Sequence, residues 1–294
     1  MNYKYCLTHA FAFTCALATP CAFSQQDWRI QSEINFAKSN YSNSQVLDQQ
    51  KSKGIRLDFD RGDIGSTLGF QNTHIDLLPS LNQPQQNQDN WLASVYKRFP
   101  VASLPGQAAL KLDTHHLRSS VASQANIYVI APQASWISAQ LPLGLDVSLA
   151  HSNYPTMPTV KQYGLAARWG FNQRQDWLEI RQYRIQKLDP IYALNHQQTQ
   201  AHEIRLTHLF TPNTSWQPKR ISMGLERGEK IFFVDMQSQT VYNMTMLNKG
   251  GHSVASTWSI QPKIDFTLQF NQNTYNLSND FKLTTVSAQS SIGW

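Results

Sequence analysis

The sequence contains little cysteine, and all of it lies near the N-terminus. Cys6, Cys15 and Cys21 are the three cysteines of the 294 residues. The rest of the chain therefore has no thiol with which to form a disulfide framework, bind a metal or act as a nucleophile. A segment without cysteine also avoids wrong disulfides if it crosses an oxidising compartment unfolded.

Long hydrophobic runs are missing as well. Beyond residue 24 no apolar stretch approaches the roughly 18 residues that identify a transmembrane helix, which excludes helical membrane spans. Stretches with helical periodicity are nearly absent, and there is no Gly-rich phosphate loop followed by Lys and Ser or Thr. The formal net charge is +6, without a clustered basic and aromatic patch, so we expect no nucleic-acid partner.

The first 24 residues have the layout of a secretory signal peptide. Lys4 is their only charge, an apolar stretch follows, and Ala22 and Ser24 occupy the −3 and −1 positions of a cleavage site before Gln25. The apolar stretch is too short for a membrane anchor, and Pro20 interrupts it. We therefore predict a signal peptide over residues 1–24. With no linker or composition break beyond it, residues 25–294 are expected to form one domain.

That domain consists of segments in which apolar and polar residues alternate, which is typical of half-exposed β-strands. The clearest is 162–171, in which Tyr163, Leu165 and Trp169 share one face. The predicted strands are 28–36, 55–60, 64–71, 91–98, 110–113, 127–140 with an interruption at Pro132, 145–149, 162–171, 177–187 with ambiguous facing, 203–210, 220–226, 254–260, 263–270 and 280–294. The count is fourteen. It becomes twelve if weak strands merge, or sixteen if Lys230–Val234 and Val241–Leu247 join the wall.

The last strand, Asp280–Trp294, has two distinct faces. One face carries Val286, Ala288, Ser290, Ile292 and Trp294, and the other carries Thr285, Ser287, Gln289, Ser291 and Gly293. This strand resembles the C-terminal strand of Gram-negative outer-membrane proteins, which ends in Phe or Trp. The resemblance implies that Val286, Ile292 and Trp294 form a signal for the barrel-assembly machinery. It also implies a transmembrane antiparallel β-barrel in the cell outer membrane, with periplasmic chaperones, outer-membrane lipid and lipopolysaccharide as partners.

The links between strands predict which way the barrel is oriented. If the last strand runs toward the periplasm, the short links Arg61–Asp63, Leu141–Gly144, Asn172–Asp176 and Gln261–Pro262 become periplasmic turns and the long links become extracellular loops. Seven of the eight tryptophans then lie near the periplasmic rim, where indole rings prefer the boundary between lipid and water. Trp91 alone is expected near the outer rim.

The inward faces of the predicted strands carry charges of both signs. The candidate pore-lining residues are Arg29, Glu33, Arg56, Asp58, Arg98, Lys111, Asp113, Arg168, Glu203, Arg205, Arg220, Lys263 and Asp265. One interpretation is a hydrated passive channel for small hydrophilic solutes, with little preference between anions and cations. The other is a lumen filled by cross-strand ion pairs that serve stability.

The segment Glu229–Gly251 is long and contains the apolar run Ile231–Val234. It either folds inward and constricts the pore, stands above the membrane as a hairpin, or adds two strands to the wall.

Two other functions remain as alternatives. The barrel of a surface polysaccharide or protein export system would need a separate periplasmic partner. A lipid hydrolase would need a His–Ser pair, but His151 and Ser152 are adjacent and point to opposite faces of a strand. Asp113 and His115 share a face without an identifiable nucleophile, and His202 and His208 lie about 20 Å apart, too far for one metal ion. We therefore predict no catalytic residues, no metal site and no cofactor.

Overall fold

A computed structural model describes residues 28–294, apart from 82–84, 101–105, 121–126, 139–140, 155–158, 188–197, 215, 231–232, 236–239, 243–246 and 277–279. The predicted signal peptide and its cleavage site lie outside these residues. Within the described residues, no helix is long and apolar enough to cross a membrane.

Fourteen strands form the wall. They are β1 (Arg29–Ser42), β2 (Leu47–Asp60), β3 (Ile64–Leu77), β4 (Gln86–Pro100), β5 (Gly106–Ser119), β6 (Ile127–Ser138), β7 (Leu143–Asn153), β8 (Val160–Phe171), β9 (Asp176–Lys187), β10 (Gln198–Leu209), β11 (Arg220–Lys230), β14 (Leu247–Gln261), β15 (Ile264–Asn276) and β16 (Asp280–Gly293). Two short 3-10 turns, η1 (Pro79–Leu81) and η3 (Asn172–Arg174), lie in the links. Two further short strands, β12 (Phe233–Asp235) and β13 (Thr240–Tyr242), pair only with each other.

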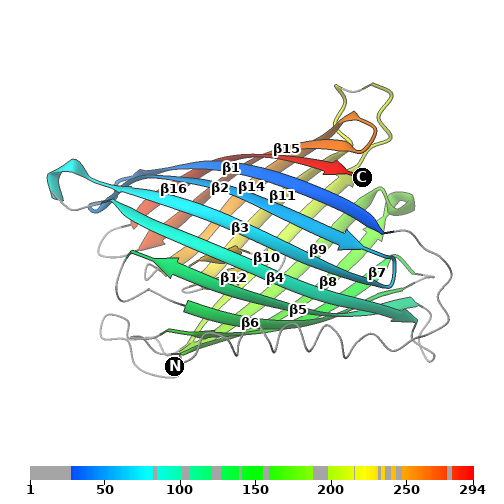
Figure 1. Cartoon of the computed structure of the whole chain (residues 1–294), viewed down its shortest axis with the longest axis horizontal. Coiled ribbons are helices and arrows are strands. Elements are labelled where there is room, and N and C mark those ends of the chain that lie inside the picture. Colours follow the sequence, from blue (N-terminus) through cyan, green and yellow to red (C-terminus); the bar gives the residue numbers. More distant parts are fainter. Residues whose placement is uncertain are drawn as a thin grey trace.

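Each wall strand pairs antiparallel with its neighbours in the chain, and β1 pairs with β16 to close the barrel (Figure 1). The last backbone N–H, that of Trp294, donates to the carbonyl of Ile30 at 2.8 Å and completes the seam. The predicted fourteen-strand antiparallel barrel is therefore confirmed. Placing Lys230–Val234 and Val241–Leu247 in the wall is wrong, because β12 and β13 form a separate hairpin.

The two ends of the barrel differ. One end, called here the short-turn end, holds Arg61–Asp63, Asn172–Gln175, Pro262–Lys263 and the C-terminal Trp294, and lies to the right in Figure 1. The opposite end, the loop end, holds the longer link between β11 and β14. The predicted contrast in link length has three exceptions. The link 210–219 is long but lies at the short-turn end. The β1–β2 link of residues 43–46 and the β15–β16 link of residues 277–279 are short but lie at the loop end.

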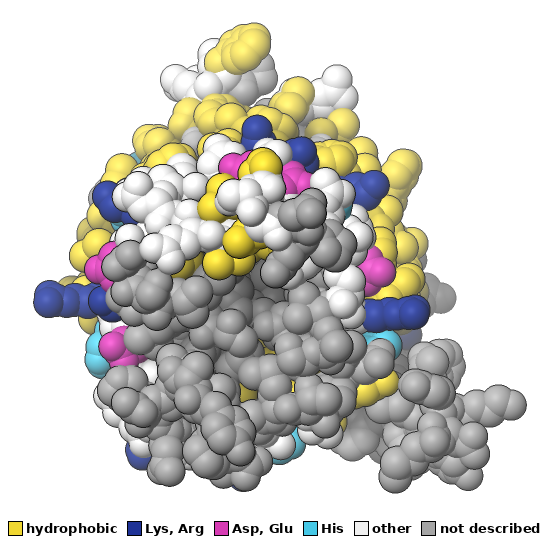
Figure 2. Space-filling model, turned by 90° about the vertical axis from the view of Figure 1, so that its left-hand side faces the viewer, with side chains coloured by type: hydrophobic (Ala, Val, Ile, Leu, Met, Phe, Trp, Pro, Cys, Tyr) yellow, Lys and Arg dark blue, Asp and Glu magenta, His cyan; other side chains and the backbone are white. Residues whose placement is uncertain are grey.

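The outward face of the barrel carries an apolar belt. Side chains such as Phe36, Leu165 and Val286 are more than half exposed even though they are large and hydrophobic. A soluble protein would bury such residues, whereas a membrane barrel places them against lipid. Figure 2 looks at the loop end and shows hydrophobic side chains on the outer side of the barrel, with Lys and Arg side chains projecting around the rim.

Toward the loop end the polarity of the two faces reverses. On β1 the outward residues change from Phe36 to Lys38 and Asn40, while the inward Tyr41 is buried. On β16 the inward Phe281 and Leu283 are buried on either side of the exposed Lys282. The strands therefore extend beyond the apolar belt, with water on their outer side and a packed apolar interior. For this reason β1 and β2 include residues 40–42 and 47–50, which lie outside the predicted strands 28–36 and 55–60.

Candidate functional site: the barrel lumen

The inner face of the barrel is built by strict alternation. Successive residues on a strand point to opposite faces, so paired strands place their polar residues on one common surface. Glu33 lies opposite Arg56, Asp58 opposite Thr67, and Ser94 opposite Asp113. The structure thus places the predicted charged residues of neighbouring strands side by side in the lumen.

One group of lumenal charges spans β1, β2 and β3. The guanidinium of Arg56 lies between two carboxylates, with Nη2 3.0 Å from Glu33 Oε2 and Nε donating to Asp58 Oδ2 at 3.0 Å. The hydroxyl of Thr67 donates to the other oxygen of Asp58 at 2.5 Å. The one guanidinium lies against both carboxylates, so the three charged residues together have a formal charge of −1.

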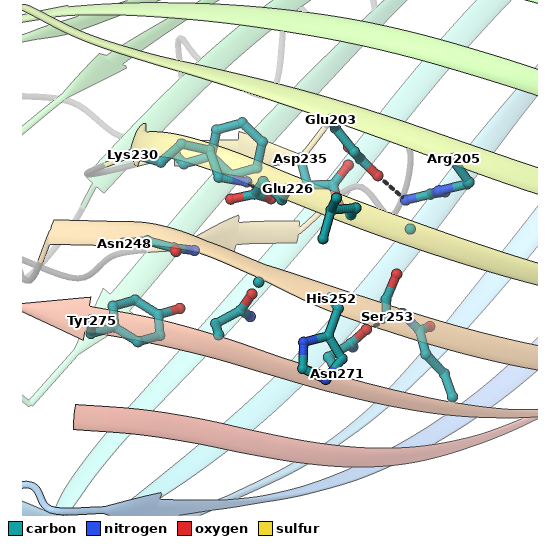
Figure 3. A pocket seen from close by; sticks show the side chains of 16 residues that line it. Glu203, Arg205, Glu226, Lys230, Asp235, Asn248, His252, Ser253, Asn271 and Tyr275 are labelled. Atoms are coloured by element: carbon teal, nitrogen blue, oxygen red, sulfur yellow. Dashed lines mark hydrogen bonds and ion pairs between the residues drawn. The ribbon is translucent and has the colours of Figure 1, made fainter. Parts of the chain in front are cut away.

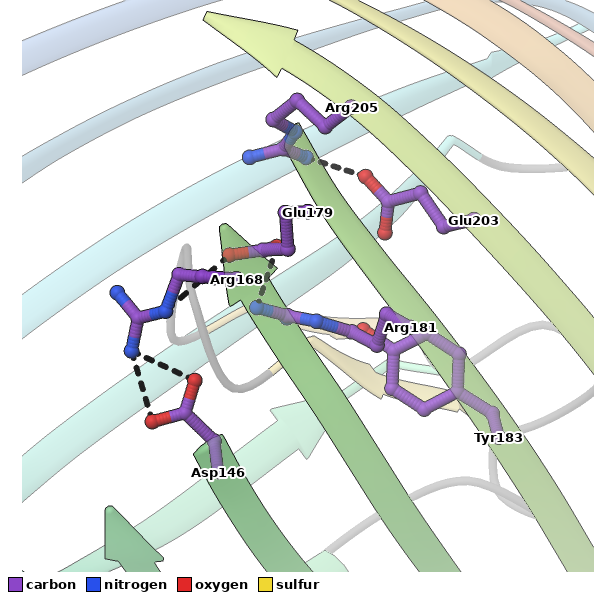
Figure 4. A network of polar contacts seen from close by, with 7 residues as sticks. All are labelled: Asp146, Arg168, Glu179, Arg181, Tyr183, Glu203 and Arg205. Carbon is purple, nitrogen blue, oxygen red and sulfur yellow. Dashed lines mark hydrogen bonds and ion pairs between the residues drawn. The ribbon is translucent and has the colours of Figure 1, made fainter. Parts of the chain in front are cut away.

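A second group, on β7, β8 and β9, is longer (Figure 4). Arg168 Nη2 donates to both oxygens of Asp146, at 2.8 and 2.6 Å, and its Nε lies 3.6 Å from Glu179 Oε2. Arg181 donates to Glu179 at 2.9 Å and to the hydroxyl of Tyr183 at 3.0 Å. Alternating charges therefore run along the wall from Asp146 toward the loop end. A cavity lies beside this group, lined by Asp146, Arg168 and Arg181 among others.

Most other predicted pore-lining residues also lie on the inner face and are paired. Arg205 donates to Glu203 at 2.5 Å, Lys111 lies 3.0 Å from Asp113, and Arg98 lies 3.4 Å from Asp60. Arg220 donates to Thr257, Asp265 forms an ion pair with Lys219, and Arg29 begins β1 at the short-turn rim. The structure corrects the prediction that Lys263 lines the pore. It lies exposed in the turn after Pro262, with a φ of 69°, and is not a residue of the wall.

The hairpin β12–β13 folds into the lumen, because Phe233 and Val234 of β12 are buried against inward-facing residues of the wall. Figure 1 draws β12 within the outline of the barrel. Gln162, an inward residue of β8, holds the backbone of the hairpin by two hydrogen bonds. The side-chain Nε2 donates to Val234 O at 2.7 Å, and the Val234 N–H donates to Gln162 Oε1 at 2.9 Å. The Phe233 ring packs edge-on against the Tyr183 ring, with the ring centroids 4.7 Å apart. Of the three interpretations of this segment, inward folding is confirmed.

The hairpin contributes to an apolar cluster that fills one side of the lumen near the loop end. Phe233 and Val234 pack there with Leu117, Ile127, Val129, Ala131, Ala150, Tyr154, Val160, Tyr183 and Ile185, all at most 4% exposed. Lys230 forms an ion pair with Glu226 and places its ammonium group 3.9 Å from the centre of the Phe233 ring. A cation over an aromatic face is attracted to the ring electrons. The hairpin is therefore anchored by hydrogen bonds, apolar packing and charge.

Several residues of this site were missed or left open by the sequence. The facing of strand 177–187 was ambiguous because its outward face changes from Leu178 and Ile180 to polar residues, while its inward face changes from Glu179 to Ile185. Once the reversal of polarity at the loop end is known, the same alternation places Glu179, Arg181 and Tyr183 in the lumen. No local signal identifies Gln162 as the partner of the hairpin.

The structure also bears on the hydrolase alternative. His151 is exposed on the outer face of β7, whereas Ser152 points inward and is 2% exposed. A histidine that cannot reach the serine hydroxyl cannot act as its general base. Asp113 and His115 are both buried on the inner face, where Lys111 pairs with Asp113. Neither pair forms a hydrolytic dyad.

The fold and lumen define a transmembrane β-barrel of the outer-membrane class. The chain superimposes on the Pseudomonas putida toluene transporter TodX with a TM-score of 0.55 at 8% identity, over 95% of this chain and 93% of that one. The Ralstonia pickettii toluene transporter TbuX superimposes with a TM-score of 0.57 at 7% identity, over 92% of this chain and 90% of that one. A bacterial polysaccharide outer membrane secretin superimposes with a TM-score of 0.52 at 8% identity, over 90% of this chain and 98% of that one. These similarities concern the fold. No protein-family model matches the sequence, and no curated protein is detectably similar to it.

Proposed function

We propose that the protein is a passive channel of the Gram-negative outer membrane for small hydrophilic solutes, with the hairpin β12–β13 as its constriction. The observation that carries this proposal is a closed barrel whose inner face is polar, with one folded segment inside it. Barrels that span the outer membrane pair an apolar outer belt with a polar interior that water can fill. The mixed-sign lining favours weak discrimination between anions and cations.

The outward face supports the proposed location. Above the apolar belt, the loop end exposes basic side chains such as Lys38, Lys51, Arg184 and Lys282. Cations at this level suit the phosphate groups of lipopolysaccharide in the outer leaflet. We infer that a signal peptide directs export, that chaperones and the barrel-assembly machinery insert the chain, and that the strand ending in Trp294 is read in that step.

Single-channel recording of the refolded protein in a planar bilayer tests the channel. The hairpin variant replaces Phe233–Tyr242 by a short Gly-Ser linker, which can close the gap because Lys230 pairs with Asn248 at its base. We expect discrete conductance steps from the intact protein and several-fold larger conductance steps from the hairpin variant. Steps from the variant alone would mean that the hairpin closes the resting barrel. Silence from both folded proteins would overturn the proposal.

One observation favours a second candidate, a channel for apolar solutes. The cluster around Phe233 gives the loop-end lumen an apolar side, and two of the fold neighbours are named toluene transporters. Apolar solutes carry no current, so this candidate requires uptake of labelled toluene into proteoliposomes. Toluene uptake that depends on the protein, combined with no ion conductance, would favour it over the hydrophilic channel.

A further inference from the structure

A cavity on the other side of the hairpin has sixteen lining residues, of which four are uncharged amides and five are charged side chains (Figure 3). Gln269, Asn271 and Asn273 alternate along β15, so all three point to the inner face, and Asn248 joins them from β14. At about 3.4 Å per residue, the three amides of β15 extend over roughly 14 Å of wall. The remaining wall is formed by β10, β11, further residues of β14 and β15, and the hairpin residues Phe233 and Asp235.

The hydrogen bonds within this wall determine which groups remain for a ligand. Gln269 Nε2 donates to Asn271 Oδ1 at 2.9 Å, so the Gln269 carbonyl and the Asn271 NH2 group stay available. Asn248 Oδ1 accepts the Gly250 N–H at 2.8 Å, so its NH2 group stays available too. Glu226 Oε1 is buried and has no hydrogen-bond partner among the described residues. A buried acceptor in this condition gains from a donor.

The charged side chains that line the cavity are Glu203, Glu226 and Asp235 against Arg205 and Lys230, with a net formal charge of −1. Glu203 neutralises Arg205 at 2.5 Å, and Glu226 forms an ion pair with Lys230. An anionic ligand would therefore compete with carboxylates for both cations. Space comes from two glycines of the wall, Gly224 and Gly251. A Cβ at Gly251 would lie 2.1 Å from Asn273 Oδ1, so a side chain there would displace the amide.

From this arrangement we propose that the cavity binds a neutral polyhydroxylated solute, a sugar or sugar alcohol. A hydroxyl group both donates and accepts, which matches the mixed donors and acceptors of Asn248, Asn271, Gln269 and Glu226. The ring of Phe233 offers an apolar surface to the C–H face of such a solute. This inference rests on the proposed channel function and names the substrate class of that channel.

Isothermal titration of the whole protein with maltose, in the sugar-free detergent lauryldimethylamine oxide, tests the cavity without requiring conductance. We expect saturable binding that gluconate and toluene do not compete away. The variant Asn271→Leu removes an amide while keeping the branched arrangement of the side chain, and it should weaken maltose binding about tenfold or more. The matched control is Gln289→Leu, an amide on the inner face of β16 outside this cavity, which should bind maltose like the parent.

Several results would overturn the proposal. These are no maltose binding by the folded protein, equal binding by the Asn271→Leu and Gln289→Leu variants, or tighter binding of gluconate or toluene than of maltose. If Asn271→Leu does not fold, Asn273→Leu takes its place. Conductance without maltose binding would contradict the proposed sugar site and support the proposed channel. Maltose binding without conductance would support the sugar site and contradict the proposal of an open channel.

Discussion

At the scale of the residue, the lumenal arginines depend on their carboxylate partners. Arg168 is held between Asp146 on β7 and Glu179 on β9, while it is itself on β8, so one side chain links three strands. A charge partly removed from water is tolerated only when it is paired and hydrogen-bonded. The same residue therefore serves the stability of the wall and sets the local charge of the passage.

Neutralising Arg168 is expected to remove the guanidinium bound to Asp146, while Glu179 keeps its bond to Arg181. The variant Arg168→Gln gives this lumenal group one more net negative charge, so the reversal potential in a salt gradient should shift toward cation selectivity. Arg184→Gln is the matched control, because Arg184 lies exposed on the outer face and donates to Gln198. An equal shift in both variants, or in neither, would contradict the assignment of Arg168 to the pore lining.

At the scale of the element, the hairpin β12–β13 differs from the wall because its backbone bonds end after three pairs. A two-stranded hairpin is marginal in water on its own. Its position depends on contacts with the wall, chiefly the two hydrogen bonds to Gln162 and the packing of Phe233 on Tyr183. The wall does not depend on the hairpin in return, since every wall strand has two neighbours in the closed barrel.

Removing the Gln162 side chain should therefore release the hairpin and leave the barrel intact. Two hydrogen bonds contribute about 1–3 kcal/mol, so Gln162→Ala should raise the population of the displaced hairpin by roughly tenfold. The measurement is the frequency of large conductance steps, which should approach that of the hairpin deletion. Gln182→Ala, on the exposed face of β9, is the control. Unchanged steps in Gln162→Ala would show that packing alone holds the hairpin.

At the scale of the whole molecule, closure leaves no free strand edge in the barrel wall. The pairing of β1 with β16 runs from Gln31–Gly293 to Ser42–Lys282, which makes the barrel one continuous hydrogen-bonded sheet. A closed barrel cannot unfold from an edge, and it keeps its backbone groups satisfied within the apolar phase.

This closure predicts heat-dependent mobility on gels. The unheated protein in dodecyl sulfate should remain a compact barrel and migrate faster than the boiled protein, and it should fractionate with the outer membrane. Identical mobility before and after boiling, together with recovery from the soluble periplasm, would contradict the membrane barrel.

The sequence by itself determined the wall. Because side chains on a strand alternate with a period of two, the order of polar and apolar residues in segments such as 162–171 assigns both the strand and its facing. The closing strand and the count of fourteen followed from the same rule. The rule failed near residues 40–50 and in 177–187, where strands leave the lipid and the apolar side turns inward.

Only the tertiary structure decided what the lumen contains. The contacts of Gln162 with Val234 and of Arg168 with Glu179 join residues whose pairing depends on barrel closure and register. An apolar run such as the one containing Phe233 could belong to a hairpin above the membrane or to one inside the barrel. Its composition therefore could not distinguish the two placements. That choice was settled by the apolar side chains that the loop-end wall turns inward, against which Phe233 and Val234 pack.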